Sequence, residues 1–584
     1  MSSAASFLDS VRQAIEAQVS NEFRTDTAPV SARATQTRTR RLQYVLPPRK
    51  VSDELQENYW NFVYPLYPFV ARKTFDQIYR SLWESAPLPD THSHLMRLDE
   101  SASMATLNLV LALGCQYCVQ NEPGEAHEEA EVFFERAHAL VPYDPTDTSV
   151  LSLQFVQVML LMAQYLIGTG KSHKAWGIIG VALRACHHLG IHRIAISLRN
   201  PLNDQDREWV RRIYLGCVTL ERIVCMNLGR PAMITVCNDC PTLLPLQTED
   251  GNFNVISPSD PSAEPSVLAF FVVSTKLYDI AQQILLSFYS EEKPDVARGY
   301  HRYFEGNPSV LKLDRKLQEW CDDIPANLEF RSGTSIAQAQ NDLAVTIRRQ
   351  AIVLRLRYLQ VRIYLFRPVF ATLCVSQSAP TSENPSGRPC GEDLNYRVAL
   401  QCCVLCVKAA KELIEIMHNN LTTTRSWGRK PAWLYGTLHV YLSATVLLAA
   451  RFRPVVTLGA ISDSELQLSW QMAMEILQSF QNDNISAQRC VFALRTLYGR
   501  LWLSADTHVV TGNENFQMQT RLPNNNLVGN GQVQSFQPTD GALSDQVALD
   551  GQEISQVFEW ADLFDAFDPS DLSWLNVVPG DLLA

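Results

Sequence analysis

Between residues 46 and 505, apolar residues recur at three- and four-residue steps, which is the spacing of an amphipathic or buried α-helix. Clear examples are SVLAFFVVSTKLYDIAQQILL (266–286), IRRQAIVLRLRYLQVRIYLFRPV (347–369) and YRVALQCCVLCVKAAKELIEIM (396–417). Alternation with a period of two, as in a half-buried strand, is nearly absent. The pattern predicts an all-α fold, built as one large multi-helical domain over 46–505.

The two ends of the chain have a different composition. Residues 1–45 are mostly polar and include a basic tract, for which we expect disorder. Residues 506–552 are rich in Asn, Gln and Gly and are also predicted to be disordered. Residues 553–584 mix acidic and aromatic side chains. Four segments therefore follow one another along the chain, with only the second expected to fold as a compact body.

Two stretches, 148–170 and 431–450, contain no charged residue. The first carries three glutamines and the second carries His439 and several hydroxyl groups. A membrane span needs about 20 predominantly apolar residues. We interpret both stretches as buried helices of a water-soluble protein and expect no membrane partner.

The stretch YLIGTGKSHKAWG (165–177) contains GTGKS, which resembles part of a phosphate-binding loop. That loop requires GxxxxGK[ST] between a strand and a helix. The first glycine of the motif falls on Tyr165, and the segment before it reads as a long buried helix. We therefore interpret Gly168 and Gly170 as a helix end, Ser172 as the N-cap of the next helix, and Lys171 as a solvated side chain.

Candidate metal and catalytic sites are weak. The pairs Cys115/Cys118 and Cys237/Cys240 are too far apart in sequence to form a typical zinc site. Three histidines occur in CHHLGIHR (186–193), without a carboxylate or thiol cluster beside them. The motifs GxSxG and HExxH and the kinase signature set do not occur. We expect no enzyme and no metal site in this chain.

One predicted helix has a more specific sequence pattern than the others. In DREWVRRIYLGCVTLERIVCMNLGRPAMI (206–234), six apolar residues form a stripe at three- and four-residue steps. Arg211 and Arg222 are expected on the side opposite the stripe, and Glu208 and Arg212 are spaced as an i,i+4 ion pair. Glu221 flanks the stripe and should be partly buried and paired.

The end of this helix is defined by three residues. Gly229 is predicted to end it, and Pro231 to prevent its continuation, with Arg230 between them.

This helix with its Gly-Arg-Pro ending resembles the middle-homology regulatory domain of fungal-specific transcription factors of the zinc binuclear cluster family. Further segments resemble that domain in the same order: NYWNFVYPLYPFVARKTF (58–75), MLLMAQYLIGTGKSHKAWGIIGVALRACHHLGIHR (159–193), LQEWCDDIP (317–325) and LRYLQVRIYLFRPVF (356–370). The resemblance covers about 46–505. It implies a nuclear regulator of transcription, with Glu221, Gly229, Arg230 and Pro231 as structural motif residues.

The resemblance also implies partners. They are transcriptional coactivators, DNA, a second copy or a related chain in a dimer, and a small-molecule effector. The resemblance further suggests control of a secondary-metabolite gene cluster, a role that is common in this family. The family's DNA-binding module has six cysteines, whereas the first cysteine here is Cys115. We expect no cofactor in this chain, and zinc only if a cluster module is supplied upstream or by a partner; DNA binding is direct only in that case.

The net charge adds a further observation. From Asp506 onward there are 12 acidic residues and one basic residue, so this tail carries the whole net charge of −11 and the rest of the chain is neutral. Such a segment stays solvated and can fold when it meets a groove in a partner. It resembles an acidic activation segment, with these residues as anchors: Val557, Trp560, Leu563, Phe564, Phe567 and Trp574. The alternative is a terminal helix that packs back on the body.

The basic tract has two interpretations. Arg33, Arg38, Arg40 and Arg41 form either a solvated linker or a patch for nuclear import or phosphate contact. For the whole chain, the alternative to a transcription regulator is a helical small-molecule-binding protein or an enzyme without a recognisable motif. A cavity lined by converging charged side chains would favour that alternative.

Overall fold

The computed structural model describes most of the chain between residues 46 and 510. The described ranges are 46–84, 99–117, 123–141, 148, 151–196, 204–234, 266–289, 296–330, 342–375, 393–423, 434–454, 460–481 and 485–510. Within these ranges the regular secondary structure is entirely helical, which confirms the predicted all-α fold. The basic tract, the Asn/Gln-rich segment and the acidic-aromatic segment lie outside the described residues, and the predicted domain boundaries stay predictions.

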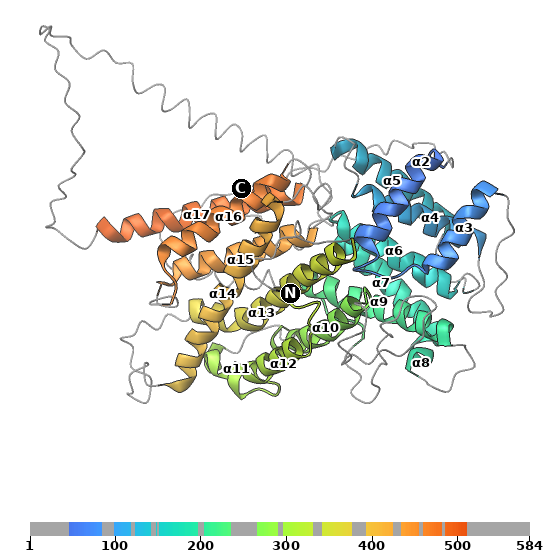
Figure 1. The fold of residues 1–584 in the computed structure, drawn as a ribbon. Coiled ribbons are helices and arrows are strands. Elements are labelled where there is room, and N and C mark those ends of the chain that lie inside the picture. The colour runs from blue at the N-terminus through green and yellow to red at the C-terminus, as the bar shows by residue number, and fades with distance from the viewer. Residues whose placement is uncertain are drawn as a thin grey trace, which may run out of the picture.

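The first group of helices lies together on one side of the molecule, coloured blue to green in Figure 1. It consists of α2 (Arg49–Asn58), a π-helical turn (Tyr59–Val63), α3 (Arg72–Glu84), α4 (Glu100–Cys115), α5 (Pro123–Leu140), α6 (Leu153–Gly168), α7 (Ser172–His188), α8 (Ile191–Ile196) and α9 (Asp204–Leu228). Helices that follow one another pack together, as α4 with α5 and α6 with α7. We call this group the N-terminal half.

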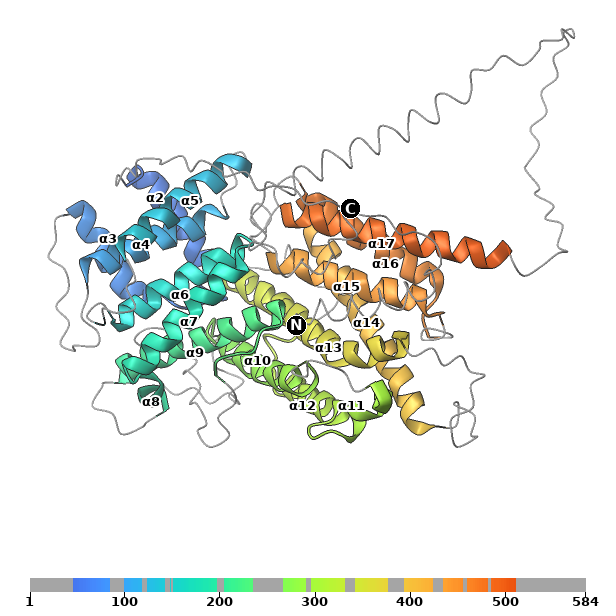
Figure 2. The same cartoon turned by 180° about the vertical axis from the view of Figure 1, so that it is seen from behind.

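The second group starts with α10 and is coloured green to orange in Figures 1 and 2. It consists of α10 (Ala269–Phe288), a 3-10 turn (Val296–His301), α11 (Arg302–Glu305), α12 (Val310–Asp322), α13 (Asp342–Val375), α14 (Leu394–Thr423), α15 (Leu434–Phe452), α16 (Asp463–Phe480) and α17 (Ile485–Val510). Its most extensive packing is between α13 and α14. We call this group the C-terminal half.

The two uncharged stretches of the sequence are α6 and α15, and both are buried. All but a few side chains of α6 are removed from solvent, because its apolar residues cover the whole circumference of the helix. Ser152 caps α6 by accepting a hydrogen bond from the amide of Phe155 at 3.1 Å. Along the described helices, none combines the length and the apolar character that a membrane crossing requires.

Other helix starts are fixed by local chemistry. The side chain of Asp99 accepts a hydrogen bond from the amide of Ala102 at 2.8 Å, which begins α4. At α16, Ser462 and Glu465 form a reciprocal capping box. Each such cap satisfies amides that have no partner within the helix and contributes about 1 kcal/mol.

The halves are joined by α13, the long helix that runs through the middle of both views (Figures 1 and 2). Arg349 of α13 donates to the carbonyl of Asn61 at 2.8 Å. Gln350 donates to the carbonyls of Pro65 and Val267, at 2.7 and 2.8 Å. These polar side chains therefore connect α13 to the turn after α2 and to the start of α10.

We predict that Gly114→Ala separates α2 from α4. A Cβ atom at this position would lie 2.0 Å from the carbonyl oxygen of Leu55, and a backbone atom cannot rotate away. The substitution should lower the free energy of unfolding by about 1–3 kcal/mol or more, as overpacking does. Urea denaturation followed by circular dichroism measures this change.

The matched control is Gly177→Ala on α7, where an added Cβ meets nothing within 4 Å. That change should stabilise the protein by about 0.5–1 kcal/mol, because alanine loses less backbone entropy in a helix than glycine does. Equal effects at the two positions would show that α2 and α4 do not approach as closely as described.

Candidate functional site

The motif Glu221, Gly229, Arg230 and Pro231 forms one compact structure at the end of α9. Gly229 adopts a φ of 62°, a left-handed conformation that favours glycine, and α9 ends at Leu228. The amide of Arg230 donates to the carbonyl of Cys225 at 3.0 Å. The predicted helix end is therefore confirmed, and the chain reverses tightly after it.

Glu221 holds the segment that follows the motif. Its carboxylate, 2% exposed, accepts hydrogen bonds from the amides of Met233 at 2.6 Å and Ile234 at 3.5 Å. Burial raises the pKa of Glu221, and the two amides and Arg222 oppose that rise. The expectation of a partly buried, paired Glu221 is confirmed; its partners are backbone amides 12 and 13 residues further along the chain.

The guanidinium of Arg230 lies over the ring of Trp176 on α7, with its Cζ atom 4.3 Å from the ring centroid. A guanidinium over an indole face is held by a cation–π attraction. The motif thus fastens the end of α9 to α7. Its role is structural, and it presents no arrangement of nucleophile, acid or base.

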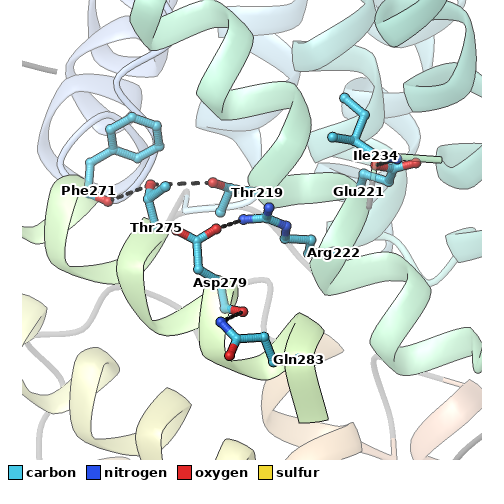
Figure 3. A network of polar contacts seen from close by, with 8 residues as sticks. All are labelled: Thr219, Glu221, Arg222, Ile234, Phe271, Thr275, Asp279 and Gln283. Carbon is cyan, nitrogen blue, oxygen red and sulfur yellow. Dashed lines mark hydrogen bonds and ion pairs between the residues drawn. The ribbon is translucent and has the colours of Figure 1, made fainter. Parts of the chain in front are cut away.

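A polar network joins α9 to α10 (Figure 3). The side chain of Arg222 forms an ion pair with Asp279. One turn earlier, the hydroxyl groups of Thr219 and Thr275 are 3.4 Å apart, and Thr275 donates to the carbonyl of Phe271 at 2.9 Å. These contacts connect the N-terminal half with the first helix of the C-terminal half.

The placement of charges on α9 differs from the sequence-based expectation. Arg211 and Arg222 were expected on a face opposite the apolar stripe, yet both are 7% exposed, because other helices cover that face too. Glu208 and Arg212 form the predicted pair, with 3.3 Å between Oε1 and Nε. The apolar stripe of α9 therefore predicted one buried face of this helix. It did not predict that the face with Arg211 and Arg222 is buried as well.

The GTGKS segment connects two helices, α6 and α7, as expected, and it follows no strand. Two details were wrong. Ser172 is the first residue of α7 and makes no capping hydrogen bond. Lys171 is not solvated: its side chain is 22% exposed, and its Nζ lies 2.7 Å from Oε1 of Glu131. Glu131 also accepts from the hydroxyl of Tyr165 at 2.9 Å, so the lysine belongs to a structural cluster.

The remaining candidate groups take structural positions. Cys115 is buried in α4, while Cys118, Cys237 and Cys240 lie outside the described residues. The rings of His187 and His192 are 4.8 Å apart, and burial lowers the pKa of His187. In the part of the chain that the structure covers, no group of three or more metal-ligating side chains comes together.

A cavity that the sequence did not predict lies at the junction of the two halves. Its enclosed volume is about 70 Å³. The apolar part of its wall is formed by Phe62, Val63, Leu66, Leu113, Val353 and Leu356.

Arg357 of α13 is the charged residue in this wall. It is 6% exposed and donates to the hydroxyl of Tyr67 at 2.7 Å and to Oγ of Ser274 at 3.1 Å. Its guanidinium also lies 5.0–5.7 Å from the ring centroids of Phe270 and Tyr278. Two hydroxyl groups and two aromatic faces are thus among the neighbours of this charge, and the ring faces attract the guanidinium.

Other polar side chains of the wall are neutral at pH 7. Burial, with a further contribution from the charge of Arg357, lowers the pKa of His439 to about 3. Burial raises the pKa of Tyr117 to about 12 and also raises the pKa of Tyr278. The phenols therefore keep their protons and His439 is uncharged.

The residues of the predicted activation segment and basic tract lie outside the described residues. No sequence signal marked Arg357, since it stands in a helix with an arginine at almost every turn; only its partners distinguish it.

Comparison with known proteins gives a consistent result. Residues 57–322 match the model of the fungal specific transcription factor domain. The chain is 26% identical over 466 residues to sorbicillinoid biosynthetic cluster transcription factor 2 of Penicillium rubens, a match that covers 78% of this chain and 61% of the relative. It is 24% identical over 471 residues to sorbicillinoid biosynthetic cluster transcription factor sor3 of Hypocrea jecorina, covering 80% and 62%.

A third relative is transcription factor FBD3 of Gibberella moniliformis, 22% identical over 418 residues, covering 70% of this chain and 51% of the relative. The chain thus matches between about half and three fifths of the length of these curated relatives.

We predict that Glu221→Ala lowers the free energy of unfolding by about 1–3 kcal/mol, because the buried amide of Met233 loses its acceptor. Glu221→Gln keeps an acceptor oxygen and should cost less. Urea denaturation of the two variants beside the wild type at neutral pH gives the comparison. If the two variants are equally destabilised, the acceptor is not what holds the segment.

The comparison of the wild type with Glu221→Gln also predicts how stability depends on pH. Because burial raises the folded pKa of Glu221 above its ordinary value of 4.5, the folded state binds the proton more tightly. The stability of the wild type relative to Glu221→Gln should then fall as pH rises from 4.5 through the raised pKa, and be constant below that window. A relative stability that increases with pH would contradict the burial described.

Proposed function

We propose that the chain regulates transcription of fungal genes in the nucleus, because residues 57–322 match the model of the fungal specific transcription factor domain. The observation that carries the proposal is the domain match, which spans the N-terminal half and extends to the end of α12. The names of the relatives, which are all transcription factors, support it.

We propose a biosynthetic gene cluster as the target. Two relatives are named as transcription factors of the sorbicillinoid biosynthetic cluster, and each matches more than three quarters of this chain. A regulator of one cluster needs a response to the state of that pathway. The helical body has a packed core in which such a response can be built.

Contact with DNA is proposed to require a zinc-cluster module. Such a module uses six cysteines, and the cysteines of this chain begin at Cys115 inside α4. The module is supplied upstream or by a partner chain, in a homo- or heterodimer. The body without the acidic tail carries no net charge, so it lacks the excess of Lys and Arg that drives phosphate binding. The tract from Arg33 to Arg41 then serves nuclear import or adds a few phosphate contacts.

Activation is assigned to the acidic-aromatic segment at 553–584. Its acidic residues keep it in water, and its aromatic residues supply the anchors by which a peptide helix enters the groove of a coactivator. Anchors of this kind carry most of the binding free energy in an interface. The acidic excess of the tail, 12 acidic residues against one basic residue, supports this assignment.

A second candidate function is small-molecule binding. The observation that favours it is the cavity around Arg357, with its apolar wall and neutral hydrogen-bonding groups. The two functions are compatible, since a transcription regulator with such a site responds to a ligand. An effector site in the helical body unites them.

The activation proposal predicts the result of a reporter assay. The full chain, fused to a heterologous DNA-binding domain, should activate a reporter that carries the matching operator. The triple variant Trp560→Ala, Phe564→Ala and Phe567→Ala should activate it about tenfold less or lower, because three anchors are truncated together.

The matched control truncates two aromatic residues of the neighbouring Asn/Gln-rich segment, Phe516→Ala and Phe536→Ala. It should retain the activity of the unsubstituted fusion, with equal protein levels verified by immunoblot. Full activity of the triple variant would remove the activation role from 553–584.

A further inference from the structure

We propose that the outer face of α7, together with the turn after α9, is a docking surface for the acidic-aromatic segment 553–584 of the same chain. We call this face the α7 surface, and it consists of Gly177, Gly180, Val181, Arg184, Arg230 and Met233. The binding part of the proposal stands on this surface and on the sequence of the segment. Its consequence for transcription rests on the proposed function, which assigns activation to 553–584.

The middle of the α7 surface carries little side-chain cover. Gly177 is exposed, and a Cβ atom added there would meet nothing within 4 Å. A Cβ atom added at Gly180 would lie 3.6 Å from Sδ of Met233, so Met233 borders this part of the helix. Met233 is 45% exposed, and a flexible thioether packs against partners of varied shape. A peptide can therefore approach α7 closely and bury apolar side chains against Val181 and Met233.

Basic groups lie at both ends of this apolar middle. Arg230 is held over Trp176, and Arg184 is exposed two turns further along α7, about 12 Å from Trp176 by the helical rise. Neither α7 nor the turn 229–234 contains Asp or Glu, and the same is true of α6 and α8, which pack on α7. The acidic residues of α9 lie in its first two turns and at Glu221, which is 2% exposed. The α7 surface is therefore positively charged.

The segment 553–584 has the complementary pattern. It contains seven acidic residues and no basic residue. As a helix, it places its aromatic anchors on one face, and Glu559 and Asp568 are then about 13 Å apart along the axis. This separation is close to that between the two basic ends of the α7 surface. A phosphate backbone has the same sign of charge but no apolar side chains for Val181 and Met233, so the surface fits an acidic peptide better.

The connection between body and segment is long enough for this contact. Residues 511–552 follow α17 and precede the segment. A chain of about 40 residues reaches about 130 Å when extended, whereas a compact domain of about 460 residues has a radius of gyration of about 23 Å. Figures 1 and 2 show α17 and α7 on opposite sides of the body, and a connection of this length spans that distance.

Docking limits activation. A segment that turns its aromatic side chains toward α7 does not offer them to the groove of a coactivator. The extent of the limitation depends on the affinity of the surface and on the effective concentration of the tethered segment. A coactivator then competes with the α7 surface for the same anchors.

The test is photocrosslinking in the purified full chain, with benzoylphenylalanine in place of Phe564. We expect a crosslink within one chain to α7 or to 229–234, chiefly to Met233, because benzophenones react readily with thioethers. Peptide mass spectrometry locates it. The control carries the same group in place of Phe536, in the Asn/Gln-rich segment, and should not label this surface. Equal labelling from both positions, crosslinks only between two copies, crosslinks only to other parts of the body, or no crosslink overturn the proposal.

Charge variants test the surface itself. Arg184→Glu should lower the crosslink yield about threefold or more, because repulsion replaces attraction. Gly177→Glu adds a carboxylate in open space and should lower the yield similarly without removing any side-chain contact. The matched controls on α17 are Arg495→Glu, at an exposed position, and Gly499→Glu, where an added Cβ also meets nothing within 4 Å. Both controls should stay within about twofold of the unsubstituted yield. Unchanged yield in the two α7 variants contradicts the site.

A reporter assay separates this inference from the proposed function. In the full chain fused to a heterologous DNA-binding domain, Gly177→Glu should raise activation about two- to tenfold, because the segment is released. The gain should vanish when Trp560, Phe564 and Phe567 are also replaced by Ala. A fusion that activates through 553–584 without a crosslink to the α7 surface refutes this inference and leaves the proposed function standing. A crosslinked chain whose activation is unchanged by the three alanines refutes the proposed function instead.

Discussion

The fold depends on the burial of polar side chains of α13 at the junction of the two halves. Arg349, Gln350 and Arg357 lie on this helix within about two turns, and all are less than 10% exposed. Removing such groups from water costs several kcal/mol unless each donor finds an acceptor. The acceptors are carbonyls and hydroxyls of the segment 61–67 and of the start and first turns of α10. Packing α13 into the centre is therefore possible only when both halves are in place.

This constraint also accounts for the cavity. Arg357 is held among Tyr67, Phe270 and Tyr278, and these rings cannot collapse onto one another while the guanidinium lies between them. The helices that surround it, α4, α6, α10 and α15, consequently leave a space at their meeting point. The same arginine that joins the halves thus lines the space between them.

Local patterns in the sequence were sufficient to predict part of the fold and part of the motif at the end of α9. The period of the apolar residues identified the all-α fold and the burial of Glu221, the Gly-Arg-Pro segment identified the end of α9, and the i,i+4 spacing identified the Glu208–Arg212 pair. These features depend on residues a few positions apart, or on the hydrophobic stripe of one helix. The motif at the end of α9 depends on such local features. The burial of Glu221 could therefore be predicted, whereas its partners, the amides of Met233 and Ile234, could not.

Long-range partners were not predictable in this way. Arg357 meets Tyr67 across 290 positions, and Arg349 meets Asn61 across 288. Lys171 looked like a solvated loop residue because Glu131, its partner, lies 40 positions earlier in another helix. The apolar helix α13 also carries arginines at almost every turn, and only the packing shows which of them turn inward.

We propose that this helical body belongs to a protein that works at promoters, because residues 57–322 match a transcription factor domain. The most direct measurement is chromatin immunoprecipitation of the epitope-tagged chain from its own host, with crosslinking that captures contact made directly or through a zinc-cluster partner. The account predicts enrichment at a small set of promoters, grouped beside the genes of a biosynthetic cluster. Signal indistinguishable from the untagged strain across the genome would contradict it.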